Sequence, residues 1–235
     1  MSVCAIVLSY KRPQNMERVI LPLCESAAID KVIVSNNNPE IDLRDALERV
    51  MREPKVELIQ QTHRSICAKR FEIALHQPFD AYLCPDDDLF LTSTQIGALI
   101  DALAHEPTRV HGVFGEIHSF SDGRLQLGGG ISGIECEVDI LNRCYAFTRA
   151  HLLQMTMLAS ELGYGDVGNA LFVDDLLISH CGDGAPICHD FGPLDSCPTS
   201  DMPGIATYKE IGFDEARVAT YLRLARSGLV QGSRR

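Results

Sequence analysis

Three consecutive aspartates, Asp86, Asp87 and Asp88, stand between two apolar runs of the chain. Adjacent carboxylates repel one another at neutral pH, and a divalent cation is the simplest way to hold them together. Mg²⁺ and Mn²⁺ prefer carboxylate oxygens and bridge to substrate phosphates. The alternative is a solvated acidic turn that caps the next helix. The apolar flanks favour the metal site, with Asp88 and Asp86 as its candidate ligands.

A second acidic pair, Asp174 and Asp175, lies inside an otherwise apolar stretch that spans residues 171–178. Acids at the start of a helix complement the helix dipole, which is one sufficient explanation for the pair. In apolar surroundings, such a pair can also supply a catalytic carboxylate that faces a cleft. We predict a catalytic role.

Amide and basic side chains occur near the ends of other predicted strands. Asn36 and Asn37 follow the second strand, where they form either a turn or a surface that recognises a base or sugar edge. Arg64, Lys69 and Arg70 precede the fourth strand. Close to the acids, these three cations can neutralise a diphosphate, whereas on a solvated helix face they would have no such role.

The composition narrows the class of partner. The formal net charge of the 235-residue chain is −11, which argues against a nucleic acid or an anionic membrane but leaves a metal-bound nucleotide open. The apolar stretch at residues 3–8 is too short for a signal peptide or a membrane span. Nine scattered cysteines without a C-x-x-C spacing indicate reduced thiols, and hence a cytoplasmic protein.

Hydrophobic periodicity predicts an α/β fold with a mainly parallel, doubly wound sheet and a mixed second half. The strands are expected at 3–8, 31–35, 56–60, 81–83, 110–114, 116–120, 124–127, 140–147 and 186–189. The helices are expected at 15–24, 43–51, 66–76, 94–104, 149–162, 174–181 and 214–226. A turn is expected at 121–123 and a mobile loop at 199–208. We predict a single domain over 1–235, with a nucleotide-binding half at 1–92 and an acceptor-binding half at 93–235.

The order of the motifs resembles the exostosin-like branch of the GT-A nucleotide-sugar glycosyltransferases. The matching segments are Tyr10–Arg12, Val32–Asn37, Gln60–Thr62 with the following Lys69 and Arg70, Asp86–Asp88, and Val173–Asp175. They cover nearly the whole chain. The chain departs from the family at Lys11 and Ser35 and has no Trp, so the resemblance specifies neither the sugar nor the acceptor.

The resemblance also implies roles for individual residues on the nucleotide side. The nucleotide would be contacted by Leu8, Ser9, Tyr10, Arg12, Asn36, Asn37, Arg64, Lys69 and Arg70. Asp86 and Asp88 would hold the ribose and the metal, with Asp88 as the direct ligand and His189 as a candidate second ligand. Asp87 would also belong to the nucleotide site. Asp175, next to Asp174, would lie near the reacting sugar carbon, and Arg217 would bind a phosphate.

The activity implied is metal-dependent transfer of a hexosyl or N-acetylhexosaminyl group. The donor would be a UDP-sugar, the acceptor a hydroxyl on a small molecule or glycan, the cofactor Mn²⁺ (or Mg²⁺), and the configuration retained. One alternative is a nucleotidyltransferase, although the turn at 9–15 lacks the glycines that such an enzyme normally needs. The other alternative is a degenerate module that only binds a nucleotide sugar.

Overall fold

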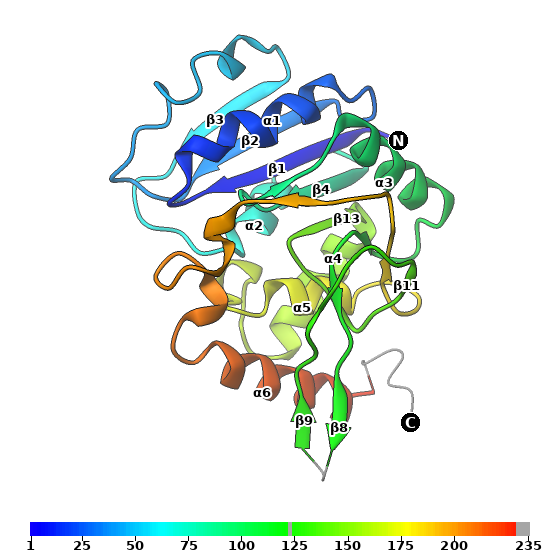
Figure 1. The fold of residues 1–235 in the computed structure, drawn as a ribbon. Helices are drawn as coiled ribbons and strands as arrows, with labels where there is room; N and C mark the ends of the chain where they lie inside the picture. The colour runs from blue at the N-terminus through cyan, green and yellow to red at the C-terminus, as the bar shows by residue number, and fades with distance from the viewer. Residues whose placement is uncertain (122–123, 229–235) are drawn as a thin grey trace.

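The computed structural model describes residues 1–121 and 124–228. An eight-stranded sheet crosses it in the order β11-β14-β6-β13-β4-β1-β2-β3 (Figure 1). Its parallel part consists of β1 (Val3–Ser9), β2 (Lys31–Asn36), β3 (Val56–Gln60) and β4 (Ala81–Pro85). Beside β4 lies the antiparallel β13 (Cys144–Thr148). The predicted α/β class with a mixed second half is confirmed.

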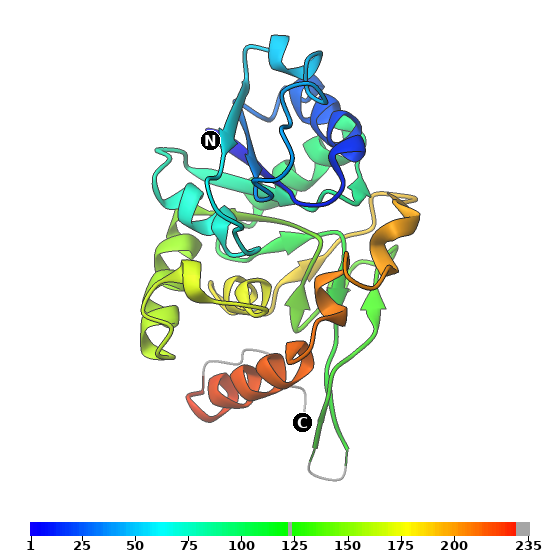
Figure 2. The same ribbon diagram turned by 90° about the vertical axis from the view of Figure 1, so that its left-hand side faces the viewer.

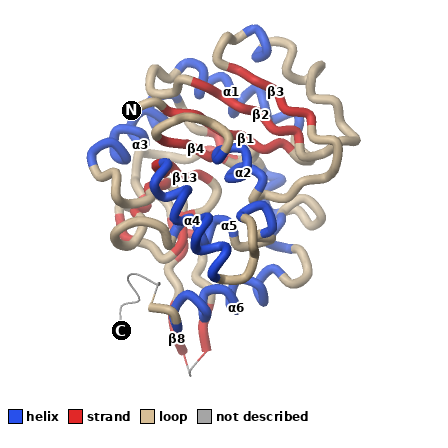
Figure 3. The backbone as a smooth tube through the Cα atoms, turned by 180° about the vertical axis from the view of Figure 1, so that it is seen from behind, coloured by secondary structure: helices blue, strands red, loops and turns tan. Residues whose placement is uncertain are grey.

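Helices cover both faces of the sheet, as Figures 2 and 3 show. One face packs against α1 (Met16–Glu25) and α3 (Ser93–His105). The other packs against α2 (Lys69–Leu75), α4 (Arg149–Glu161) and α5 (Asp174–Ser179). Successive residues of β1 belong alternately to the two cores, which explains why this strand is apolar throughout.

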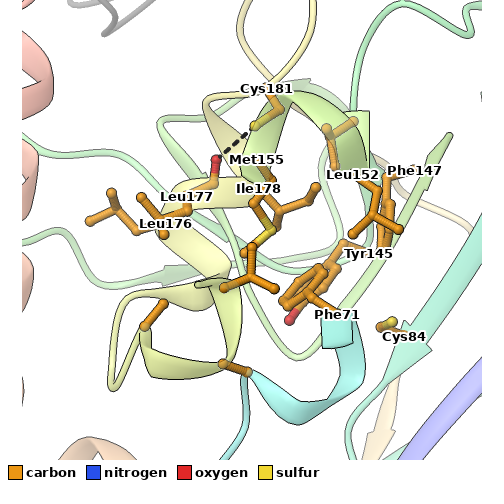
Figure 4. Close-up of a cluster of buried hydrophobic side chains, with 14 of the residues drawn as sticks. Phe71, Cys84, Tyr145, Phe147, Leu152, Met155, Leu176, Leu177, Ile178 and Cys181 are labelled. Carbon is orange, nitrogen blue, oxygen red and sulfur yellow. Dashed lines mark hydrogen bonds between the residues drawn. The ribbon is translucent and has the colours of Figure 1, made fainter. Parts of the chain in front are cut away.

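A cluster of aromatic side chains packs α2 against the sheet (Figure 4). The Phe71 ring stacks on Tyr145 of β13 with centroids 6.0 Å apart, and it lies 5.5 Å from Phe147. Ring pairs at these separations add to the burial energy of a core. Because Arg70 precedes Phe71 on α2, this packing fixes where the guanidinium of Arg70 emerges, 5.6 Å from the Tyr145 ring.

Short strands build most of the second half. They are β5 (Leu89–Phe90), β6 (His111–Gly112), β7 (Gly115–Glu116), β8 (Ser119–Ser121), β9 (Arg124–Gln126), β10 (Gly130–Ile131), β11 (Cys136–Glu137), β12 (Ile140–Leu141), β14 (Ile187–Cys188) and β15 (Asp195–Ser196). β10, β7 and β12 form a separate small sheet, and β8 and β9 form a hairpin that projects from the body (Figure 1). The helix α6 (Phe213–Arg226) follows Gly212, whose φ is 86°.

The strand predicted at 140–147 is wrong as a single element. Arg143 has a φ of 59°, and this left-handed residue turns the chain between β12 and β13. Its carbonyl accepts a hydrogen bond from the Asp86 amide at 2.6 Å, and Asn142 donates its amide to Phe114. The break therefore places Asn142 and Arg143 beside the acidic run.

Three other predicted elements differ from the structure. In place of a helix at 43–51 there are turns and one 3₁₀ turn, Val50–Arg52, in a segment where the Asp42 carboxylate binds the Arg44 amide. The strand predicted at 116–120 is divided between β7 and β8. The loop at 199–208 contains the 3₁₀ turns Pro198–Asp201 and Thr207–Lys209. Of the turn at 121–123, residues 122 and 123 lie outside the described residues.

The helix predicted at 94–104 is α3, which begins one residue earlier, at Ser93, and has Thr92 as its N-cap. The Thr92 hydroxyl accepts from the Gln95 amide at 3.2 Å, and the Gln95 side chain accepts from the Thr92 amide at 2.9 Å. This reciprocal arrangement is a capping box.

Thr92 and Thr94 give a matched pair for a stability test. We expect Thr92→Ala to lower the free energy of unfolding by about 1 kcal/mol through loss of the cap. Thr94→Ala, at an exposed position of the same helix, should leave it nearly unchanged. Urea denaturation followed by circular dichroism measures both, and equal losses in the two variants would contradict the assignment of the cap.

Candidate active site

A cavity of about 810 Å³ opens where the parallel strands end. The carboxyl ends of β1 and β4 lead into it, as is usual for sites in open α/β sheets. The small sheet, α5 and α6 supply the opposite wall. Most residues that the sequence singled out lie on this cavity: Leu8, Tyr10, Arg12, Asn37, Arg64, Arg70, Asp86, Asp87, Asp88, Asp174, Asp175 and Arg217.

One end of the cavity combines an aromatic ring with cations. The Arg64 guanidinium lies 4.8 Å from the centroid of the Tyr10 ring, and the Lys11 ammonium lies 5.1 Å from it. The Asn37 side chain also borders this end, but its amide already bonds Ser35 and the Ile66 carbonyl. Tyr10 and its cations form a surface suited to a planar base or an anionic group.

Arginines pair with all three aspartates of the 86–88 run. Arg12 Nη1 lies 2.7 Å from Asp87, and Arg12 Nη2 lies 3.1 Å from Asp88. Arg143 Nη2 lies 3.2 Å from Asp88. The expectation that a metal ion is the simplest way to hold the run together was therefore incomplete, because guanidinium groups already offset much of the repulsion.

Asp86 pairs with Arg70, whose Nη2 lies 2.8 Å from Asp86 Oδ1. Arg70 is 5% exposed, and its Nη1 has no hydrogen-bond partner among the described residues. A buried donor without a partner is costly unless a ligand completes it. Arg70 is therefore positioned to donate to an anionic group beside Asp86.

The second acidic pair lies on the opposite wall of the cavity, at the start of α5. Asp175 Oδ1 accepts from Arg217 Nη1 at 2.6 Å and from the Leu176 amide at 2.8 Å. Arg217 is 2% exposed and also donates to the Phe172 carbonyl. Arg217, for which the resemblance implies phosphate binding, thus holds Asp175 in place in this structure.

Asp174 differs from its neighbour because it is buried. Burial, and then the nearby charge of Asp175, raises the pKa of Asp174 to about 7. A raised carboxyl pKa means that the folded state holds the proton more tightly than the unfolded chain. The stability gained in this way is fully present below about pH 4 and is lost as the pH rises through about 7.

This linkage predicts that the Asp174 carboxyl contributes more stability to the ligand-free protein in mild acid than in mild base, whereas the lowered pKa of partly buried histidines such as His118 acts in the opposite direction. Between about pH 5 and 8, we expect the Asp174 contribution to fall by roughly 2–4 kcal/mol. Asp174→Asn should remove that part of the slope, and it should leave the part that arises from Asp87, where burial raises the pKa to about 6 against the charge of Arg12. Urea denaturation across this pH range tests the prediction, and parallel curves for the two proteins would contradict it.

Four predicted site residues do not line the cavity. Ser9 is buried, and its Oγ has no hydrogen-bond partner among the described residues. The Asn36 amide donates to the Ile41 carbonyl and to Gln60, so it shapes the loop behind the cavity. Lys69 pairs with Glu72 at 2.6 Å and borders a separate hollow of about 390 Å³.

The fourth is His189, the candidate second metal ligand. It follows β14, which is separated from β4 by β6 and β13, and so it lies away from the aspartates. His189 Nε2 is 2.8 Å from His111 Nδ1, and its Nδ1 is 3.5 Å from Glu135. Both ring nitrogens of His189 therefore lie next to other side chains, His111 and Glu135.

Glu116, Asn142 and Arg143 line the cavity but were missed in the sequence. Burial raises the pKa of Glu116, which ends the two-residue strand β7. No periodicity singles out an acid in so short a strand. Asn142 and Arg143 stood inside what looked like a continuous strand, and only the left-handed turn at Arg143 exposes them to the site.

Asp86 and Asp88, at the end of β4, are the carboxylates that could bind a metal ion in the cavity. In the described ranges, no group of three or more His, Cys, Asp or Glu side chains is gathered as a metal site. Mg²⁺-type ions, however, are commonly held by one or two carboxylates together with substrate phosphates and water. Asp86 has one oxygen beyond its contact with Arg70, whereas the two oxygens of Asp88 lie beside Arg12 and Arg143, so an ion held by the pair and a diphosphate would share Asp88 with these arginines.

Comparisons with known proteins place the fold. No family model matches the chain, and a search of curated proteins finds no match. Among solved structures, S. aureus TarS 1–349 in complex with UDP gives a TM-score of 0.57 at 11% identity, over 83% of this chain and 59% of that one. The complex of TarS with UDP-GlcNAc gives 0.55 at 13% identity, over 83% and 57%. CMP:2-keto-3-deoxy-manno-octonic acid synthetase with CTP gives 0.46 at 13%, over 67% and 78%.

The similarity to TarS shows a fold of the GT-A type. The chain spans just under three fifths of the TarS structures. Nothing in the matches is specific to the exostosin-like branch. Across residues 1–121 and 124–228, the helices are either too short or too polar to span a bilayer.

Proposed function

We propose that the protein is a metal-dependent glycosyltransferase that moves a sugar from a UDP-sugar to a hydroxyl acceptor. One observation carries the proposal: a single cavity holds a base-sized aromatic end, a run of acids paired with arginines, and a separate carboxylate clamped by Arg217. The fold shared with TarS, whose structures contain UDP and UDP-GlcNAc, supports the choice of donor. Membership of the exostosin-like branch stays a prediction from the motif order.

The leaving diphosphate would lie beside Arg70. Breaking the sugar–phosphate bond leaves negative charge on the diphosphate, and a preorganised cation in a water-poor site stabilises that charge. Arg70 Nη1 is a donor without a partner among the described residues, and Asp86 holds the same guanidinium in place. Mn²⁺ or Mg²⁺ held by Asp86 and Asp88 would add Lewis-acid stabilisation of the same oxygens.

Asp175 would act at the sugar. The anomeric carbon gains positive character as the bond breaks, and a nearby carboxylate stabilises it. Arg217 and the Leu176 amide both hold Oδ1 of Asp175, so the side chain keeps one orientation while its other oxygen can face the reacting carbon. Retention of configuration and transfer of a hexosyl or N-acetylhexosaminyl group are part of the proposal. NMR of the product tests both: the anomeric proton shows the configuration, and the other sugar signals identify the group.

Titration calorimetry with UDP in the presence and absence of Mn²⁺ tests the nucleotide site. We expect Mn²⁺-dependent binding to wild type and at least about a tenfold weaker affinity in Asp88→Asn, because one of two metal carboxylates is lost. The matched control is Asp101→Asn, at an exposed position of α3.

Two outcomes would count against the proposal. UDP binding that is equal in wild type and Asp88→Asn, or unchanged by EDTA, would contradict the metal site. Release of pyrophosphate from a nucleoside triphosphate, without release of UDP from any UDP-sugar, would favour a nucleotidyltransferase instead.

A further inference from the structure

Beyond Asp175, the cavity wall carries a polar group that the proposed reaction does not yet use. Glu116 comes from β7, Asn142 from the turn before β13, and Arg217 from α6. Glu116 Oε1 accepts from Asn142 Nδ2 at 2.7 Å, and Glu116 Oε2 lies 3.6 Å from Arg217 Nη2. Three elements far apart in the sequence thus converge on one spot.

Two buried atoms of this group lack a hydrogen-bond partner among the described residues. They are Asn142 Oδ1 and Arg217 Nη2. The orientation of the Asn142 amide follows from its neighbour, since the Glu116 carboxylate can only accept and must face the NH₂ group. Arg217 is only 2% exposed to solvent. We therefore expect a bound ligand to supply the missing hydrogen-bond acceptor for its Nη2.

A hydroxyl group matches this set of atoms. Its oxygen can accept from Arg217 Nη2 while its hydrogen is donated to Glu116 or to Asn142 Oδ1. The gap of 3.6 Å between Glu116 and Arg217 is too long for a direct hydrogen bond, which leaves both groups ready for such a bridge. An ammonium group would satisfy the two acceptors as well.

A phosphate or carboxylate does not match. It brings only acceptor oxygens, so Asn142 Oδ1 would stay unpaired. Glu116 and Asp175 would also repel it, and they already share the single cation Arg217. This end of the cavity therefore differs in charge from the end around Arg12 and Arg70, and Arg143 lies between the two, 3.2 Å from Asp88 and 5.1 Å from the Phe114 ring.

Aromatic surface lies next to the polar group. Phe114 and Phe172 both line the cavity. A Cβ added at Gly130 would stand 2.4 Å from Phe114 Cε1, so the absence of a side chain there leaves room for the ring. Flat apolar rings beside hydrogen-bonding groups suit the C–H face and the hydroxyl edge of a sugar.

The position of the group identifies the substrate that it would contact. Arg70 pairs with Asp86, whereas Arg217 pairs with both Asp175 and Glu116. Glu116, with Asn142 bonded to it, therefore shares its cation with the proposed catalytic carboxylate and not with the proposed diphosphate position. We propose that Glu116 and Asn142 form the acceptor subsite, and that this subsite takes an uncharged or amine-bearing sugar and excludes phosphorylated or carboxylated ones. The inference rests on the proposed function.

The test uses the full chain saturated with Mg²⁺ and UDP, because Mg²⁺, unlike Mn²⁺, is diamagnetic and does not broaden NMR signals. The probes are methyl β-glucopyranoside, glucosamine, glucose 6-phosphate and glucuronic acid, titrated by saturation-transfer NMR. We expect the first two to bind and the last two to bind at least about tenfold more weakly. In Glu116→Gln, the neutral sugar should lose about tenfold in affinity and the discrimination against glucuronic acid should shrink, because one repelling charge is gone. UDP affinity should not change.

Glu161→Gln, at the exposed end of α4, is the matched control, and Asn142→Ala should reproduce the loss of sugar affinity if Glu116→Gln fails to fold. A preference of wild type for the anionic sugars, binding of none of the neutral ones, or a loss of UDP affinity in Glu116→Gln would overturn the inference. Absence of UDP binding to wild type would instead contradict the proposed function, and so the two failures are distinguishable.

Discussion

Replacing Asp175 with Asn is expected to lower kcat by about a thousandfold while the affinity for UDP stays within a factor of two to three of wild type. The Asn Oδ1 atom still accepts from Arg217 Nη1 and the Leu176 amide, so the local geometry is kept. What disappears is the negative charge that the reacting sugar carbon needs. The loss should therefore fall on the chemical step and not on nucleotide binding.

The measurement pairs steady-state release of UDP from the UDP-sugar that binds best with calorimetry of UDP. Asp101→Asn controls for the loss of one carboxylate elsewhere in the chain. Asp174→Asn separates the two neighbours, since the buried Asp174 should affect stability more than turnover. Full activity in Asp175→Asn would remove Asp175 from the catalytic role, and a matching loss of UDP affinity would assign it to the nucleotide site.

The first half of the chain was largely predictable because most of its strands are long and buried. β1, β2 and β4 read as apolar runs, the half-exposed β3 pairs with β2, and parallel strands must end at one edge of the sheet. Residues that follow those ends, such as Tyr10 and Asp86, therefore had to gather there. Burial and chain direction alone bring Arg12 and the aspartates together.

The second half was less predictable because local geometry decides it. β7 and β12 have two residues each, too few for any period, and a non-glycine residue at a φ of 59° separates β12 from β13. Glu116 and Asn142 reach the cavity only through these features. The position of His189 could not be predicted for a different reason. The sequence shows that a strand precedes this histidine, but not where that strand lies in the sheet.

The acidic run also shows what a linear pattern omits. Three adjacent aspartates predicted a bound cation. In the structure, the cations that pair with them are three arginines, from the turn after β1, from α2 and from the loop before β13. A metal ion would join this set and need not replace it. From these ion pairs we also expect the acidic run to contribute to the stability of the fold through its arginines.

Arg12→Met should destabilise the folded protein by about 3–5 kcal/mol, because it strands the Asp87 carboxylate in a buried position. Both side chains are about nine-tenths buried, and Arg12 Nη1 lies 2.7 Å from Asp87 Oδ1. The same guanidinium donates to the Thr199 hydroxyl at 3.0 Å and to its carbonyl at 3.2 Å, so the 3₁₀ turn at Pro198–Asp201 would lose its tie to the β1 turn.

The double variant Arg12→Met with Asp87→Asn separates the two contributions. If the cost comes from an uncompensated charge, neutralising Asp87 should restore most of the free energy of unfolding, and the coupling energy should be about 2 kcal/mol or more. If the cost comes from the contacts with Thr199, the double variant should be no more stable than Arg12→Met. Arg12→Lys keeps the charge but lacks the planar fork, so it should fall between Arg12→Met and wild type. Urea denaturation of wild type, the single variant Asp87→Asn and the three Arg12 variants gives the coupling energy and decides between these explanations.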